Sequence, residues 1–262
     1  MNRNNDLISI IVTVYKNYIY LNDLIKSVES QTHKNYELIF INDGSDKKVI
    51  NFLENYDFNE KNKIKIYNIK RFYRSKSLNY GISKSSSDII CILDSDDYWH
   101  PKKLELQLYY LKQLNLKFLA TSSLLFYEDA NIKISKKFLL NISKINHRSF
   151  FYTNHIPHSS VMAYKNLLQY NEKLFQNVDL DLWLRISQNI DIYKIELPLT
   201  FIRRHESQFF YGNTVYRRII YFKNSLSVRF NQSKILLNKL LISIFILKFT
   251  LSLFKFSLRK IK

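Results

Sequence analysis

The chain is predicted to be an α/β protein with a three-layer, mostly parallel sheet and a C-terminal amphipathic helical tail. Two observations predict the sheet: β-branched apolar runs alternate with helical patterns, and the last of these runs ends in three carboxylates. A third observation predicts the tail, because the end of the chain is apolar and basic and contains no acidic residue after Glu206.

Apolar runs rich in Ile and Val mark four strands, and a segment with helical spacing lies between each pair. The first such segment places Leu21, Leu24, Ile25 and Val28 on one helix face. The expected strands are residues 8–15, 37–41, 64–67 and 89–93, and the expected helices are residues 21–28, 49–55 and 77–84. This alternation is typical of parallel strands joined by crossover helices.

The pattern continues less regularly beyond residue 100. A helix that begins at Pro101 carries regularly spaced leucines, and residues 118–125 read as a strand. From Phe126 the aromatic side chains are scattered without a clear period, until a helix is expected over residues 180–190 and a strand over residues 199–202.

Composition sets the general class of the protein. A hydrophobic content of 46% in 262 residues supplies a large core and argues against disorder. Cys91 is the single cysteine and falls inside a predicted strand, so we expect a core thiol and a reducing compartment. The polar residues that open the chain predict no secretory signal.

Glycine is scarce, which makes its positions informative. Only Gly44, Gly81 and Gly212 occur. We expect Gly44 and Gly81 to stand where the backbone needs a positive φ or where another segment approaches closely, although ordinary turns would also suit each of them.

The run Asp94-Ser95-Asp96-Asp97 directly follows the apolar residues 89–93. Three neighbouring carboxylates repel one another unless a cation lies among them, and the carboxyl end of a buried strand is where ligands bind in open α/β sheets. Oxygen ligands suit Mg²⁺ or Mn²⁺, and phosphate oxygens of a substrate often complete the coordination shell of such an ion. The run therefore predicts a metal-assisted site for a phosphorylated ligand; a solvated turn before the next helix is the alternative.

The net charge of +18 calls for an anionic partner, which could be nucleic acid, a membrane or a substrate. In a helix over residues 235–261 a polar and basic stripe forms, with apolar residues around it; the stripe consists of Lys248, Ser252, Lys255, Arg259 and Lys262. Lys248 argues against a bilayer span, so we expect a helix lying on an anionic inner leaflet, with packing on protein as the alternative. The acidic run argues against nucleic acid.

Several blocks over residues 8–205, taken in order, resemble the family 2 nucleotide-sugar glycosyltransferases of GT-A fold. These blocks are Thr13-Val14-Tyr15, Ser30-Gln31-Thr32, Asn42-Asp43-Gly44-Ser45, Asn79 with Gly81, Asp94-Ser95-Asp96-Asp97 as the DXD signature, His158-Ser159-Ser160, Asp179-Leu180-Asp181-Leu182-Trp183-Leu184-Arg185, and Arg203-Arg204-His205. Three positions depart from the family pattern: Lys16 replaces Asn, Leu78 replaces an Arg that contacts phosphate or ribose, and Val178 replaces a Glu.

The resemblance implies an inverting transfer of a sugar from a nucleotide-sugar, expected to be a UDP-sugar, to a glycan or lipid-linked acceptor. It implies a role for each matched residue: Thr13, Tyr15 and Asp43 at the uracil, Asn79 and Asp94 at the nucleotide, Asp96 and Asp97 on Mn²⁺ or Mg²⁺ with His205 as a third ligand, Arg203 and Arg204 at the diphosphate, and Asp179 as general base. Without the resemblance, Asp179 would read as a helix N-cap.

We therefore expect a GT-A domain over residues 1–206, with a nucleotide-binding half at 1–100 and an acceptor half at 101–206, and a membrane-associated tail over 207–262. The expected location is cytoplasmic, peripheral on the inner face of the cell membrane, with surface polysaccharide synthesis as the process and no nucleic acid as a partner. Two alternatives stand beside this reading: a catalytically silent GT-A scaffold in a membrane complex, and a basic nucleic-acid-binding protein.

Overall fold

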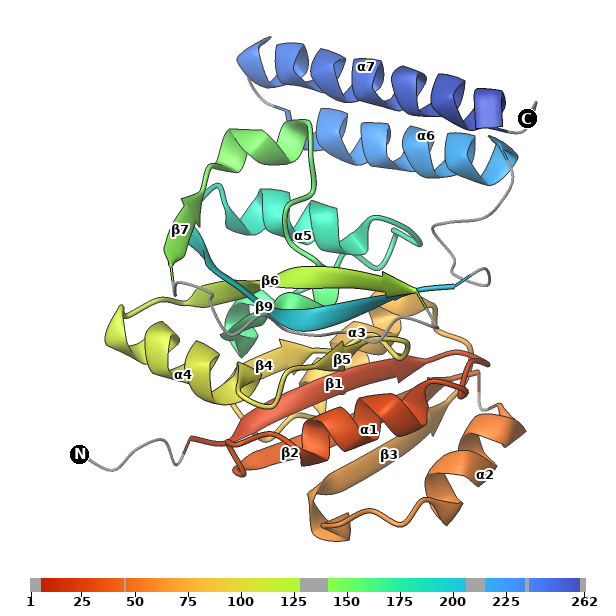
Figure 1. Ribbon diagram of the computed structural model, residues 1–262, viewed down its shortest axis with the longest axis vertical. Helices are drawn as coiled ribbons and strands as arrows, with labels where there is room; N and C mark the ends of the chain where they lie inside the picture. Colours follow the sequence, from red (N-terminus) through yellow and green to blue (C-terminus); the bar gives the residue numbers. More distant parts are fainter. Residues whose placement is uncertain (1–5, 45, 128–140, 206–214, 234–235, 260–262) are drawn as a thin grey trace.

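The computed structural model describes residues 6–44, 46–127, 141–205, 215–233 and 236–259 (Figure 1). In these segments the α-helices are α1 (Leu21–Glu29), α2 (Lys47–Asn55), α3 (Arg74–Ser83), α4 (Lys103–Gln113), α5 (Val178–Ile186), α6 (Val215–Gln232) and α7 (Leu236–Arg259). The strands are β1 (Ile8–Val14), β2 (Tyr36–Asp43), β3 (Ile64–Ile69), β4 (Ile89–Ile92), β5 (Tyr98–Trp99), β6 (Phe118–Tyr127), β7 (Ile142–Ile145), β8 (Met162–Tyr164) and β9 (Ile192–Arg204). Short 3₁₀ helices include η2 (His147–Phe151) and η3 (His158–Ser160).

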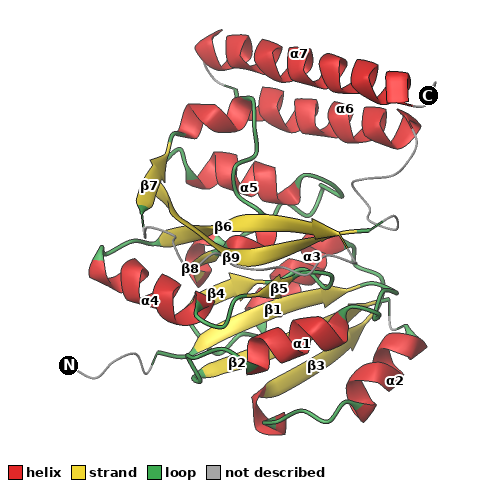
Figure 2. Ribbon diagram, viewed as in Figure 1, coloured by secondary structure: helices red, strands yellow, loops and turns green. Residues whose placement is uncertain are grey.

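The strands of the described segments form one sheet in the order β3-β2-β1-β4-β8-β6-β9-β5, and β7 pairs with β9 outside this path. The first four strands are parallel, as the repeated strand–helix pattern predicts. The short β8 runs antiparallel between β4 and β6 and joins the two halves of the sheet. Figure 2 shows helices on both faces of the sheet, so the expected three-layer, mostly parallel GT-A architecture is confirmed.

Successive side chains of β1 point to opposite faces of the sheet and pack into two separate hydrophobic cores. Ile10, Val12 and Val14 pack into a cluster with α1, α2 and α4, whereas Ile11 packs into the other cluster with α3 and α5. All these side chains are fully buried, because a central parallel strand is covered on both faces. The apolar run that looked continuous in the sequence is thus divided residue by residue between two layers.

Both glycines singled out from the sequence stand where a side chain is unwelcome. Gly44 has a φ of +106° in the turn after β2. A Cβ on Gly81 of α3 would lie 2.6 Å from Cγ2 of Ile11, so its absence lets α3 approach β1 closely. The turn that follows Asp43 therefore depends on Gly44, and the packing of α3 on β1 depends on Gly81.

The strand expected over residues 199–202 is the last part of β9, which spans 13 residues. Pro198 interrupts the pattern because it lacks an N–H for the ladder, and the register of β6 against β9 shifts at this point. The helix expected to reach residue 190 ends at Ile186. The short strands β5, β7 and β8 carried too few residues to show a period. Of these, only β8 was anticipated, because residues 158–162 resemble the acceptor-side strand of the family.

The expected helix in the tail is present as α7, which pairs with α6, and α6 packs against α5 (Figure 1). Phe222 of α6 stacks on Phe245 and Phe249 of α7, at centroid distances of 5.3 and 4.0 Å. Nothing is described of the side chains of Ser252, Lys255 and Arg259, and Lys262 lies outside the described residues. In the described part of the chain, no helix combines the length and the apolar character needed to cross a membrane.

Candidate functional site

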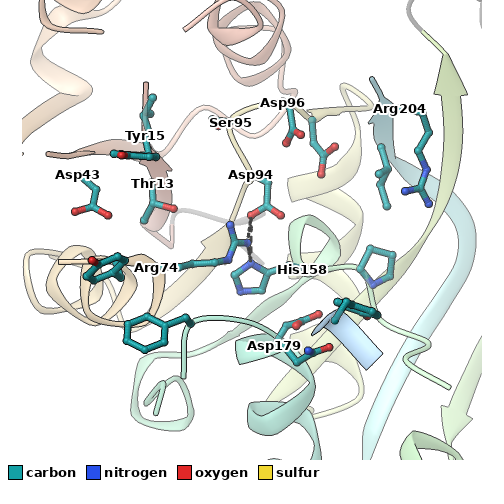
Figure 3. Close-up of a pocket in the computed structure, with 18 of the residues that line it drawn as sticks. Thr13, Tyr15, Asp43, Arg74, Asp94, Ser95, Asp96, His158, Asp179 and Arg204 are labelled. Carbon is teal, nitrogen blue, oxygen red and sulfur yellow. Dashed lines mark hydrogen bonds and ion pairs between the residues drawn. The ribbon is translucent and has the colours of Figure 1, made fainter. Parts of the chain in front are cut away.

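A cavity of about 580 Å³ lies at the carboxyl ends of β1, β2 and β4. Because these strands are parallel, the residues that follow them meet at one edge of the sheet. This brings together Thr13, Tyr15, Asp43, Asp94, Asp96 and Asp97, which stand far apart in the sequence, and α5 adds Asp179 to the same cavity. In Figure 3, Thr13, Tyr15 and Asp43 lie together at one side, away from Asp179 and with Asp94 between.

The end of the cavity expected to hold uracil contains an arginine that the sequence did not single out. Arg71 forms an ion pair with Asp43, and its guanidinium carbon lies 3.5 Å from the centroid of the Tyr15 ring. Asp43 also accepts a hydrogen bond of 2.6 Å from the N–H of Phe72. In this structure Arg71 therefore contacts both Asp43 and Tyr15, the two side chains to which the resemblance assigns the binding of uracil.

Asp94 is held by two basic side chains. Nη2 of Arg74 lies 2.6 Å from Oδ1 of Asp94, and Nδ1 of His158 lies 3.2 Å from the same oxygen (dashed lines in Figure 3). Burial alone would raise the pKa of Asp94, but the charges of Arg74 and His158 and their hydrogen bonds outweigh it and hold that pKa well below its usual range. Asp94 is thus an anion fixed in place and suited to accept hydrogen bonds from hydroxyl groups.

Asp97 is in the opposite electrostatic situation. Its carboxylate accepts hydrogen bonds from the hydroxyl group of Ser159 at 2.5 Å and from the N–H of Arg203 at 3.1 Å. Burial, followed by the negative charges of Asp96 and Asp94, raises the pKa of Asp97 well above its usual range. A cation beside Asp97 would remove much of this cost.

The carboxylates after β4 suit a hard divalent cation with few protein ligands. Among the described residues, no three or more His, Cys, Asp or Glu side chains are grouped so that they could hold a metal ion by themselves. Mg²⁺, however, is usually bound by one or two carboxylates with substrate phosphates and water. The oxygen donors of Asp96 and Asp97 and the raised pKa of Asp97 fit such an ion.

Asp179 lies in the first turn of α5, on the cavity. Its Oδ2 accepts a hydrogen bond of 2.7 Å from the side-chain amide of Asn154, which orients the carboxylate. The residue at the N-cap position is Asn177, so the N-cap role that the sequence alone would suggest for Asp179 is not the one it has. A carboxylate fixed in a cavity and open to a ligand can accept a proton from a hydroxyl group.

Three residues predicted for the site do not line the cavity. Asn79 bonds the main chain of Tyr170 and the side chain of Glu172, and so fastens α3 to that segment. Arg203 pairs with Asp23 at 2.6 Å and donates to the main-chain oxygen of Asp96, which supports the acidic run.

His205 is the third of these residues. Its Nε2 lies 3.0 Å from Oδ2 of Asp96, and its ring packs on Tyr20. Arg204, the neighbour of Arg203, does line the cavity.

Several further lining residues were not predicted as site residues. They are Arg71, Tyr73, Arg74, Pro157, His158, Phe175, Asn177, Ile202 and Tyr221. For Arg74 a signal existed, since it stands one helical turn before Leu78, where the resemblance expects an arginine. For Tyr221 there was none, because α6 reaches the site only through its packing on α5.

Comparison with known proteins identifies the family of the chain. Residues 9–168 match the family model described as Glycosyl transferase family 2. The chain is 32% identical over 185 residues to the O-antigen biosynthesis glycosyltransferase WbnJ of Escherichia coli, covering 69% of this chain and 72% of the relative. It is 29% identical over 209 residues to an uncharacterized glycosyltransferase of Methanocaldococcus jannaschii, covering 76% and 70%.

Solved structures show the same fold. The structure of S. aureus TarS 1-349 in complex with UDP-GlcNAc superposes with a TM-score of 0.67, covering 91% of this chain and 71% of that chain at 14% identity. The complex of TarS 1-349 with UDP gives a TM-score of 0.65, covering 91% and 70%, at the same identity. At this level of identity the likeness concerns the fold.

Proposed function

Because the chain belongs to glycosyl transferase family 2, and is thus a glycosyltransferase, we propose that it is an inverting enzyme that uses a UDP-sugar. The proposed acceptor is a hydroxyl group of a glycan or lipid-linked glycan in cell-surface polysaccharide synthesis. The name of the relative WbnJ, an O-antigen biosynthesis glycosyltransferase, supports this process. The complexes of TarS with UDP and with UDP-GlcNAc, which share the fold, support the choice of nucleotide.

One observation carries the proposal. One cavity is lined by three kinds of group that the reaction needs. Tyr15 and Asp43 would bind the uracil, and the acidic run after β4 would bind the diphosphate with its metal ion. Asp179 stands apart from them and would face the acceptor. Asp43 can accept the imide N–H of uracil, since a carboxylate is an acceptor only, provided that Arg71 yields its place. Asp94 is ionised by its basic neighbours and can accept hydrogen bonds from the ribose hydroxyls.

In the proposed reaction Asp179 removes the proton of the acceptor hydroxyl group. The acceptor oxygen forms a bond to the anomeric carbon of the sugar, while the bond from that carbon to the diphosphate breaks and UDP leaves with the electron pair. A single displacement of this kind inverts the anomeric configuration. Asp96 and Asp97 would hold Mn²⁺ or Mg²⁺, which supplies charge neutralisation for the diphosphate, and Arg204 adds a positive charge to the same cavity.

The tail supports a location on the inner face of the cell membrane. On α7, Ile242 is buried toward the protein, whereas Ile244, Leu247 and Leu251 are 42%, 60% and 54% exposed. These three residues recur at helical spacing and lie beside the exposed Lys248. A basic helix with an exposed apolar face suits an anionic membrane surface. On such a surface, a lipid-linked acceptor would be within reach of the cavity.

The test is calorimetric titration of UDP into the protein with and without Mn²⁺, for wild type, Asp96→Asn and Asp97→Asn. We expect tighter binding of UDP with Mn²⁺ in the wild type and loss of this gain in both variants. Asp96→Asn matters most, because Asp97 also bonds Ser159 and the main chain and its variant could be less stable. A thermal melt of each variant checks folding.

Two other outcomes would replace the proposal. UDP-sugar binding without turnover in the presence of acceptor lipids would favour a silent scaffold of the same fold. Salt-sensitive, sequence-tolerant binding of nucleic acid together with no binding of UDP would favour the basic nucleic-acid-binding alternative.

A further inference from the structure

Asn177 immediately precedes α5 and lines the cavity beside Asp179. Its φ and ψ are 53° and 31°, in the left-handed region, whereas a residue at the N-cap position normally has extended backbone. Its side chain makes no capping hydrogen bond to the first turn of α5. Asparagine is therefore not present here for the capping role that usually explains it.

The side-chain NH2 group of Asn177 is buried and unpaired in the described part of the chain. The residue is 3% exposed, and its Nδ2 atom has no hydrogen-bond partner among the residues that the structure describes. A buried amide that lacks a partner costs about 1–3 kcal/mol. Glycine would satisfy the left-handed backbone without this cost. Contacts within the described residues therefore do not explain this donor.

The surroundings of Asn177 are fixed by the tail helix α6. Nδ2 of Asn224 donates a 2.8 Å hydrogen bond to Oε1 of Gln176, the residue before Asn177. Nε2 of Gln232 donates to Oδ1 of Asp181, one turn into α5, at 3.2 Å. Tyr221 of the same helix lines the cavity. Helix α6 therefore holds the start of α5 at two points, and Tyr221 adds an aromatic side chain to the cavity.

We propose that Asn177 is a sugar-binding residue whose side-chain amide donates a hydrogen bond to an oxygen of the substrate beside Asp179. The partner is a hydroxyl or carbonyl oxygen of a sugar, either the sugar being transferred or the sugar of the acceptor. This inference rests on the proposed function, since it takes the substrate to be a sugar. Tyr221 of α6 lines the same cavity, so the tail supplies one of its walls.

The decisive variant is Asn177→Gly, which keeps the left-handed backbone and removes the amide. Asn177→Asp keeps the size of the side chain and removes the donor. Asn115→Gly is the matched control, because Asn115 also has a positive φ of 49° but is exposed at the end of α4, outside the cavity. All proteins are full-length and are compared by thermal melting first.

Binding is measured with UDP and with UDP-glucose, UDP-galactose, UDP-GlcNAc and UDP-GalNAc, in the presence of Mn²⁺. Transfer is measured to p-nitrophenyl glycosides of the same four sugars. We expect Asn177→Gly to melt no lower than the wild type, because the variant removes the unpaired buried donor, and to leave UDP binding unchanged. A roughly tenfold loss should then appear in the affinity for the UDP-sugar if the partner is the transferred sugar, or in KM for the glycoside if it is the acceptor.

Asn177 is a purely structural residue, and the inference is overturned, if Asn177→Gly lowers the melting temperature while UDP-sugar affinity and transfer stay at wild-type values. An unchanged melt with unchanged affinity and transfer overturns it equally. A wild type that binds neither UDP nor any UDP-sugar contradicts the proposed function itself, and this result is distinct from both.

Discussion

Nη2 of Arg74 lies 2.6 Å from Oδ1 of Asp94, so the first carboxylate after β4 is paired with a cation from α3. The same guanidinium nitrogen lies 2.7 Å from Nδ1 of His158, which in turn contacts the hydroxyl group of Tyr170 at 2.6 Å through Nε2. This network connects the sheet edge, α3 and η3 in one partly buried arrangement. Arg74 stands one helical turn before Leu78, the position where the family pattern has an arginine.

Substituting Arg74→Gln should weaken UDP binding about tenfold, because Asp94 loses its cation and the cavity loses a positive charge. Arg74→Lys should recover part of the affinity, since it restores the charge without the planar fork. Calorimetry of UDP with Mn²⁺ measures both effects. Lys144→Gln is the control, as it removes a cation from an exposed ion pair with Asp191. Wild-type affinity in Arg74→Gln, with a lowered melting temperature, would leave Arg74 a purely structural role.

Substituting Asp179→Asn should lower the rate of sugar transfer by roughly 10²- to 10⁴-fold, because the acceptor hydroxyl loses its base. UDP binding should stay at the wild-type value, since Asp179 lies away from the side of the cavity that holds Thr13, Tyr15 and Asp43 (Figure 3). Steady-state transfer and calorimetry give the two readings. Asp191→Asn provides a carboxylate control on the surface. An Asp179→Asn variant with undiminished transfer would exclude Asp179 as the base.

Lys103 should make the stability of the protein depend on alkaline pH. Its side chain is fully buried, donates to Gln107 at 2.6 Å and lies over the ring of Trp99, and burial lowers its pKa from 10.5 to about 8. Between these two values the unfolded chain binds more protons than the folded protein, so the free energy of unfolding rises with pH, by up to roughly 3 kcal/mol.

The comparison of wild type with Lys103→Met isolates this effect. Denaturant unfolding between pH 7.5 and pH 9.5 should show a gain in stability for the wild type that the variant lacks. Groups other than Lys103 contribute equally to both proteins. Equal pH slopes for the two would show that the amine of Lys103 is not perturbed in the folded protein.

The exposed face of α7 should govern binding to anionic membranes. The double substitution Leu247→Gln with Leu251→Gln should lower binding to phosphatidylglycerol vesicles about tenfold, because two exposed leucines no longer enter the lipid. Binding should also fall as salt is raised. Co-sedimentation measures it, and Leu114→Gln is the control, since Leu114 is 48% exposed at the end of α4. Equal sedimentation of all three proteins would contradict the proposed membrane face.

The sequence by itself determined the first half of the fold and the acidic end of β4. Residues 8–93 alternate between β-branched runs and helical spacing, and the rule that parallel strands end at one edge then places Thr13, Asp43 and Asp94 together. The scarce glycines also indicated their own roles, because a positive φ and a close helix–strand contact both exclude a side chain. These features follow from local chemistry.

Only the tertiary structure decided which charges meet around that edge. The contacts of Arg71 with Asp43 and of His158 with Asp94, and the presence of Tyr221 at the cavity, join segments that no periodicity relates. The same holds for Asn79 and Arg203, whose side chains are directed to structural partners instead of the cavity. Side-chain partners depend on the packing of whole elements, and the antiparallel β8 that joins the two halves of the sheet is three residues long, too short to show a period in the sequence.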